Sequence, residues 1–111
     1  MRYSIIYGIL NPEISERISL GLVIVGDKEI SVRYSTQKMK ALRLLCDEKQ
    51  YEFVSRVIRS MHFGSVDEIN YMVRYSNNLI ALSAVQQIDL DNNEQNRNWL
   101  YRNYVYAGSQ T

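Results

Sequence analysis

The chain has little of the side chains that most often build metal and nucleophilic sites. Its 111 residues include one cysteine, Cys46, and one histidine, His62. Structural zinc needs three or four Cys and His ligands, so no such site is expected within one chain. A lone cysteine cannot form an internal disulfide, and a reducing compartment is the simplest expectation. We expect Cys46 to be a buried, inert thiol and His62 to cap the carbonyl groups of a preceding helix.

Several catalytic and targeting signatures are also missing. The five glycines lack the Gly-x-x-x-x-Gly-Lys-Ser/Thr spacing of a phosphate loop and the Gly-x-Ser-x-Gly turn of serine hydrolases. Apolar runs such as residues 22–25 are far shorter than the roughly 20 residues that span a bilayer. The first residues do not resemble a signal peptide, so we expect a cytoplasmic protein that does not bind membranes. We expect no metal and no cofactor, and an enzyme is the less favoured class.

Tyrosine, in contrast, is abundant. Nine tyrosines stand beside two phenylalanines and one tryptophan. Tyrosine buries an apolar ring while its hydroxyl stays in water, so it suits exposed faces and interfaces. This composition favours a protein partner or a homodimer. Trp99 is expected in the core, with an interface hot spot as the alternative.

The first 35 residues predict three consecutive antiparallel strands, at residues 2–10, 18–25 and 30–34. Both alternating faces of the first segment are largely apolar, which predicts a central strand covered on both sides. In the second segment, one face is expected to carry Ile18, Leu20, Leu22 and Ile24. The third segment alternates as a half-buried strand near a sheet edge does, and residues 26–29 predict the hairpin turn before it.

The period then changes to that of helices. Capping residues predict four helix starts, at Ser35 or Thr36, Asp47, Ser65 and Asp91, the last three followed by Gln50, Glu68 and Glu94 as capping boxes. These helices are expected to end near residues 45, 61, 76 and 106. The first should bury Met39, Leu42 and Leu45, and a left-handed Gly64 should follow the second. Residues 79–83 predict a strand that residues 86–90 extend or flank.

The order of elements is therefore βββαααβ(β)α. Strands that come first and helices that follow predict an α+β fold rather than a parallel, doubly wound sheet. We expect a three- to five-stranded, mainly antiparallel sheet with helices packed on at least one face. Residues 1–106 should form a single domain, and residues 107–111 a flexible tail.

Charge is balanced overall, at a formal net charge of +1, but unevenly distributed. Two stretches of the predicted helical region and the strand before it carry basic residues without acidic ones, at Arg33, Lys38, Lys40, Arg43, Arg56 and Arg59. Solvated helix faces are the simpler interpretation of this pattern. The alternative is a basic face that binds nucleic acid.

Glu16 and Arg33 are predicted to fall at the same end of the hairpin formed by the second and third strands. They would then pair across the strands as a structural salt bridge, which contributes at most about 1 kcal/mol if exposed. The alternative is a polar patch that binds a partner or ligand. With Ser19, these two residues are the candidate binding residues.

The same region carries a resemblance to a family. The pattern Tyr3-Ser4-Ile5-Ile6, Asn11-Pro12, Glu16-x-x-Ser19-x-Gly21-Leu22-Val23-Ile24 and Val32-Arg33-Tyr34 resembles a family of small bacterial proteins of unknown function. That family has an N-terminal strand followed by Glu-x-x-Asn-x-Gly-Val-Val, and residues 79–106 are also similar. Glu16, Gly21 and Arg33 match the family pattern, whereas Ser19 stands where the family usually has asparagine.

Members of that family are often encoded beside HipA-like kinases. The resemblance therefore implies an accessory protein associated with a kinase or a toxin–antitoxin system, and a HipA-like kinase as the partner. The leading hypothesis is a cytoplasmic bacterial protein-interaction module. The alternatives are a nucleic-acid-binding accessory protein that uses the basic face, and an enzyme with an unrecognised site near Glu16 and Arg33.

Overall fold

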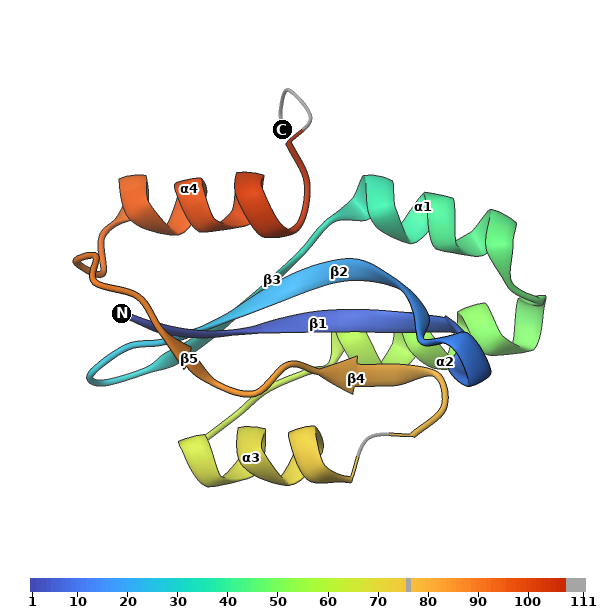
Figure 1. Cartoon of the computed structure of the whole chain (residues 1–111), viewed down its shortest axis with the longest axis horizontal. Helices are drawn as coiled ribbons and strands as arrows, with labels where there is room; N and C mark the ends of the chain where they lie inside the picture. Colours follow the sequence, from blue (N-terminus) through green and yellow to red (C-terminus); the bar gives the residue numbers. More distant parts are fainter. Residues whose placement is uncertain (76, 108–111) are drawn as a thin grey trace.

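The computed structural model describes residues 1–75 and 77–107, and within them the chain forms an α+β fold with a five-stranded antiparallel sheet and four helices (Figure 1). The strands are β1 Arg2–Asn11, β2 Glu16–Val25, β3 Ile30–Tyr34, β4 Ile80–Leu82 and β5 Gln86–Gln87. The helices are α1 Thr36–Leu45, α2 Glu48–Arg59, α3 Val66–Arg74 and α4 Glu94–Tyr104, and a 3-10 turn, Pro12–Ile14, joins β1 to β2. No helix in the described ranges has the length and apolar character needed to cross a membrane.

The sheet has the order β3-β2-β1-β4. β5 also pairs with β1, at Arg2 and Tyr3, whereas β4 pairs with β1 further along that strand. β1 is therefore central, as its two apolar faces predict, and β3 lies at an edge. α4 lies on one side of the sheet and α3 on the other (Figure 1). The predicted element order is confirmed, although the last two strands are shorter than expected.

Two hydrophobic cores use opposite faces of this sheet. The three-helix core, under α1, α2 and α3, is centred on Ile6, Leu20, Val23, Met39, Leu42, Val54, Ile58 and Ile69. The α4 core consists of Tyr3, Ile5, Leu22, Ile24, Leu100, Tyr101 and Val105. Successive side chains of β1 alternate between the two cores, which explains why this strand is apolar on both faces.

The predicted face of β2 is wrong because this strand contains a β-bulge. Ile6 of β1 pairs with Gly21 and the next residue, Tyr7, pairs with Ser19, so Leu20 has no partner in β1. An extra residue reverses the side to which the following residues point. Leu20 consequently packs in the three-helix core, whereas Leu22 packs in the α4 core. The apolar pattern could not reveal the bulge because both faces of β2 are buried.

Side chains cap the helices at three of the four predicted starts. The side chains of Ser35, Asp47 and Ser65 accept hydrogen bonds from backbone N–H groups of the first turns of α1, α2 and α3. The prediction for α4 is wrong by two residues: Asn93, not Asp91, accepts the N–H of Asn96 at 2.8 Å. Asp91 instead contributes its backbone carbonyl, which accepts from the side-chain amide of Asn96.

Several predicted helix ends also differ from the structure. The hydroxyl of Ser60, rather than His62, donates to the carbonyl groups at the end of α2. Gly64 does not adopt a left-handed conformation. Leu45 is exposed rather than inward, because α1 ends there and only Met39 and Leu42 reach the core. The predicted ends at residue 76 and in the tail after residue 107 lie outside the described ranges.

Candidate functional site

α4 carries two exposed aromatic side chains, Trp99 and Tyr104. Trp99 is 40% exposed and Tyr104 is 39% exposed. The expectation that Trp99 lies in the core is wrong, because α4 turns its neighbours Leu100 and Tyr101 toward the sheet. Successive helix residues are rotated by about 100°, so burying these two leaves Trp99 on the flank of the helix.

A series of aromatic contacts connects this surface with the core. Tyr3 of β1 stacks on Tyr104 with ring centroids 5.6 Å apart, and Trp99 meets Tyr104 edge-on at 6.5 Å. The hydroxyl of Tyr3 donates to Oε1 of Gln86 at 3.0 Å. Burial, followed by the neighbouring Tyr104, raises the pKa of Tyr3. The exposed rings are thus held in place by buried neighbours before any partner arrives.

A depression lined by polar residues lies along α4. It has a volume of about 560 Å³ and is lined by Asn93, Glu94, Gln95, Asn98 and Arg102. Aromatic side chains bordered by polar ones are the arrangement of protein interfaces, in which an apolar centre is surrounded by a polar rim.

Arg33 belongs to this side of the molecule. Its Cζ lies 3.7 Å from the centroid of the Tyr101 ring, and its Nη1 donates to Oδ1 of Asn98 at 2.8 Å. The predicted pair with Glu16 is wrong. Arg33 is opposite Leu22, six positions along β2 from Glu16, which is about 20 Å in an extended strand. The reason is that β3 is only half as long as β2, so Glu16 projects beyond the hairpin.

Ser19 and Lys38, which belong to different predicted sites, meet in the structure. The Nζ of Lys38 donates to the hydroxyl and to the carbonyl of Ser19, at 3.0 and 3.1 Å. β3 ends opposite Gly21, so the Ser19 carbonyl lies beyond the ladder, and Lys38 satisfies it. Burial lowers the pKa of Lys38. A serine beside a lysine is also a nucleophilic pair in some hydrolases, but here the amine is occupied in closing the end of a strand.

The other predicted basic residues are divided between two helices. Lys40 and Arg43 are exposed on α1, and Arg56 and Arg59 are exposed on α2. The guanidinium of Arg43 lies 5.3 Å from the ring centroid of Tyr51 and so bridges the two helices. Nucleic-acid binding by these residues stays a prediction.

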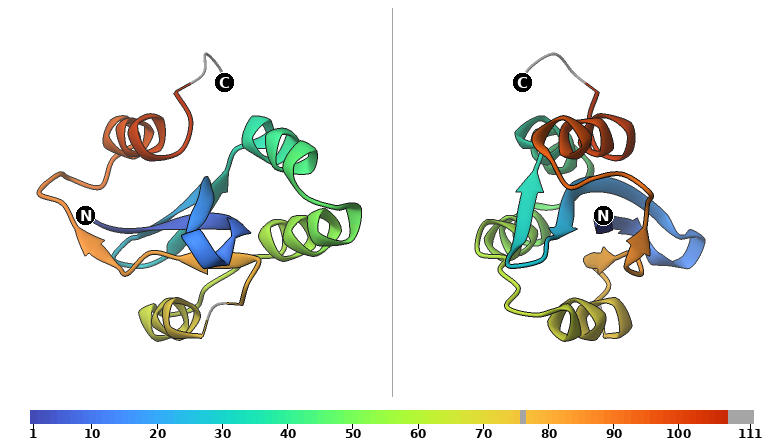
Figure 2. Two further views of the ribbon diagram at one scale, coloured as in Figure 1. Left: turned by 45° about the vertical axis from the view of Figure 1, so that its right-hand side comes forward. Right: turned by 90° about the vertical axis from the view of Figure 1, so that its left-hand side faces the viewer.

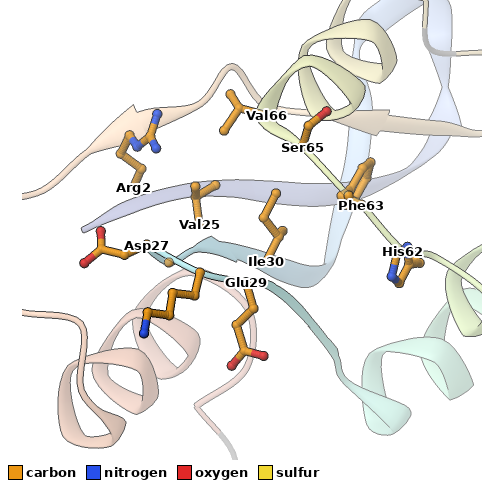
Figure 3. A pocket seen from close by; sticks show the side chains of 12 residues that line it. Arg2, Val25, Asp27, Glu29, Ile30, His62, Phe63, Ser65 and Val66 are labelled. Carbon is orange, nitrogen blue, oxygen red and sulfur yellow. The ribbon is translucent and has the colours of Figure 1, made fainter.

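A further pocket lies at the hairpin end of the sheet and was not predicted. It has a volume of about 630 Å³ and is lined by residues of the hairpin, the start of β1 and the segment between α2 and α3. In Figure 3, Val25 and Ile30 lie between Arg2 on one side and Phe63 and His62 on the other, with Val66 above them. Only folding brings the hairpin and residues 62–66 together, so no sequence spacing indicated this pocket.

The charges around this pocket are largely balanced. Arg2 and Lys28 line it together with Asp27 and Glu29. A carboxylate already occupies the N-terminal end of α3, because Oε2 of Glu68 accepts the N–H of Gly64 at 2.6 Å. The pocket therefore presents no concentrated charge for an ionic ligand.

Cys46 is partly buried rather than fully buried. Its Sγ donates to the carbonyl of Leu42 at 3.2 Å. Burial, with a smaller contribution from the charge of Asp47, raises the thiol pKa and disfavours the reactive thiolate. In the two described ranges, no group of three or more Cys, His, Asp or Glu side chains is placed to hold a metal ion.

Comparison of the chain with protein-family models, with curated proteins and with solved structures found no match. Of the candidate residues, the structure places Arg33 beside α4, joins Ser19 to Lys38, and leaves Glu16 apart at the far end of β2. The exposure of Trp99 agrees with the interface hot spot that sequence reasoning offered only as the alternative, whereas the residues of the hairpin pocket were missed by that reasoning.

Proposed function

We propose that the chain is a protein-interaction module of the bacterial cytoplasm that binds its partner through the outward side of α4. The observation that carries this proposal is the exposure of Trp99, the single tryptophan, beside Tyr104. Tryptophan, tyrosine and arginine are the residues most enriched among binding hot spots. α4 carries all three types, as Trp99, Arg102 and Tyr104, although Arg102 and Tyr104 are two residues apart and so lie on different sides of the helix.

The geometry supports binding because the aromatic rings are already ordered. Tyr104 is held between Tyr3 and Trp99 by stacked and edge-to-face contacts. A ring that is fixed before binding loses little conformational entropy when a partner covers it. A partner that presents an apolar pocket for Trp99 and polar groups for the adjacent depression fits this surface.

The resemblance supports a HipA-like kinase as this partner, and with it the role of an accessory protein in a kinase or toxin–antitoxin system. Cys46 is a partly exposed free thiol, and such thiols persist in a reducing compartment.

The experiment is affinity purification at low salt from the source cells, followed by mass spectrometry and by affinity measurement with the recovered protein. Trp99→Ala should weaken binding about 30-fold, the effect of losing a hot spot of about 2 kcal/mol. Tyr71→Ala is the matched control, because Tyr71 is 65% exposed on α3 at the other face of the sheet. This control should bind as the wild type does.

Two results would contradict the proposal. One is the absence of any stoichiometric protein in the wild-type eluate, and the other is equal binding by Trp99→Ala and wild type. Recovery of nucleic acid that moderate salt removes would instead favour the basic residues of α1 and α2.

A further inference from the structure

The outer edge of β3 has no strand beside it in residues 1–75 and 77–107. β3 ends the strand order and forms one margin of the sheet (Figure 2). An edge strand presents backbone donors and acceptors that can pair with another chain. β3 pairs with β2 without a bulge and contains no proline, so neither of these common obstacles to edge pairing is present.

The hydrogen-bond pattern identifies the residues that face outward. The N–H of Gly26 donates to the carbonyl of Glu29, and the N–H of Ser35 donates to the carbonyl of Leu20, both at 2.8 Å. In an antiparallel ladder, alternate residues bond to the same neighbour, so the odd-numbered residues of β3 bond to β2. Ile30, Val32 and Tyr34 therefore direct their N–H and C=O groups away from the sheet.

The side chains of β3 suit an apolar continuation of the sheet. Ile30, Val32 and Tyr34 are partly buried and pack against the three-helix core. Ser31 and Arg33 are exposed on the other face. A strand placed beside β3 would cover the remaining exposed surface of the apolar row and leave the polar row in water.

We propose that the edge of β3 binds the same edge of a second copy of this chain, with the two strands antiparallel about a two-fold axis at Ser31. The two sheets then form one continuous sheet. In this register Ile30 lies opposite Val32 of the second copy, and both residues direct their backbone groups toward the interface. Residues opposite each other in an antiparallel pair share a face, so the apolar rows of the two copies meet.

Charge complementarity selects this register. Pairing about Ser31 places Arg33 opposite Glu29 of the second copy, and the two-fold axis repeats this contact. Pairing about Val32 would instead place Arg33 opposite Ser31. Glu29 and Ser31 line a pocket of about 250 Å³ on the α4 side of the edge together with Asn92 and Arg97, and the guanidinium of Arg97 already donates to Oδ1 of Asn92.

The first measurement is the molar mass by light scattering over a series of concentrations. We expect the wild type to dimerise and Val32→Pro to be a monomer, because proline removes an N–H that points toward the second copy and bonds to nothing in β2. Val32→Thr is the matched control, which keeps the N–H and should dimerise. Far-UV circular dichroism verifies that each variant folds.

The second measurement tests the register by exchange of charges. Glu29→Arg and Arg33→Glu should each weaken dimerisation about tenfold, because each places like charges opposite one another. The double variant should recover the wild-type dimer, although it also lacks the stacking of Arg33 on Tyr101. Trp99→Ala should leave the dimer unchanged, so this proposal and the proposed function fail separately.

A wild type that stays monomeric throughout the concentration series overturns the proposal. A dimer that Val32→Pro leaves intact does so as well, since it must use another surface. Single charge variants that dimerise like the wild type, or a double variant no better than they are, overturn the register about Ser31.

Discussion

Gly21 shows at the scale of one residue why the sequence around the bulge is constrained. A Cβ atom at this position would lie 2.6 Å from the carbonyl oxygen of Arg33 and 3.2 Å from Cα of Tyr34. Both neighbours are backbone atoms of β3, which cannot rotate away as a side chain can. The glycine therefore allows the close approach of β2 and β3 just where the bulge reverses the faces of β2.

We predict that Gly21→Ala lowers the free energy of unfolding by about 1–3 kcal/mol, the usual cost of overpacking. The measurement is urea denaturation followed by circular dichroism. Gly64→Ala is the control, because the atom nearest to its added Cβ is 3.6 Å away, at the end of the Glu68 side chain. Gly64 also has no left-handed backbone, so this variant should be neutral or slightly stabilised. Equal losses in both variants would contradict the role given to Gly21.

Trp99 and Lys38 show how residue roles depended on folding. The type and number of aromatic residues suggested an interface, but not that Trp99 would be exposed while Leu100 is buried. Lys38 was one cation among six in a predicted basic face. Its contact with Ser19 arises because the bulge and the short β3 leave one carbonyl without a ladder partner. Neither condition is visible in the local sequence.

At the scale of elements, helix starts were predicted best. Ser35, Asp47 and Ser65 cap the helices that the sequence assigned to them, because a cap is a contact over three residues and needs no tertiary structure. The start of α4 differs because residues 91–93 offer three capping side chains in a row. The backbone carbonyl of Asp91 turns toward Asn93 and Asn96, which leaves the capping position to Asn93.

The start of α4 gives a prediction that separates the two caps. Asn93→Ala should lower the free energy of unfolding by about 1 kcal/mol, because it removes the acceptor of the Asn96 N–H. Asp91→Ala should change stability by less than about 0.5 kcal/mol, because only the backbone of Asp91 is used. Thermal unfolding of the two variants and the wild type at one pH makes the comparison. A larger loss of unfolding free energy in Asp91→Ala than in Asn93→Ala would show that Asp91 is the capping residue, as the sequence predicted.

At the scale of the whole molecule, β1 and β2 connect the two cores. Each strand contributes residues to the three-helix core and to the α4 core. A substitution that destabilises one core should therefore destabilise the other as well. We expect the chain to unfold in one cooperative step.

We predict that Leu100→Ala in the α4 core and Ile58→Ala in the three-helix core each cost about 2–5 kcal/mol, because both side chains are almost completely buried. In both variants, urea unfolding followed by Trp99 fluorescence and by far-UV circular dichroism should give the same midpoint. A fluorescence transition that precedes the loss of circular dichroism in Leu100→Ala would show that α4 unfolds by itself.

The two proposed contacts can coexist on one molecule. The outward side of α4 and the outer edge of β3 are separate surfaces, but Arg33 connects them, because it stacks on Tyr101 of α4 and is opposite Glu29 of the second copy in the proposed dimer. A β3-linked dimer would carry two α4 surfaces and could bind two partner molecules. A partner that is itself a dimer would engage both surfaces at once, and such linked binding raises the overall affinity without any new contact at either site.

The sequence by itself determined the order of elements, the α+β class, the central position of β1 and three of the four helix caps. These features depend on apolar periodicity and on contacts within a few residues, which a single sequence displays directly. Only the tertiary structure decided which core receives each residue of β2, where Trp99 and Arg33 lie, and which residues form the hairpin pocket. Those outcomes depend on one unpaired residue in a ladder and on segments far apart in the chain. The position of the unpaired residue and the meeting of distant segments are set by how the two cores pack. The local sequence pattern does not reveal this packing.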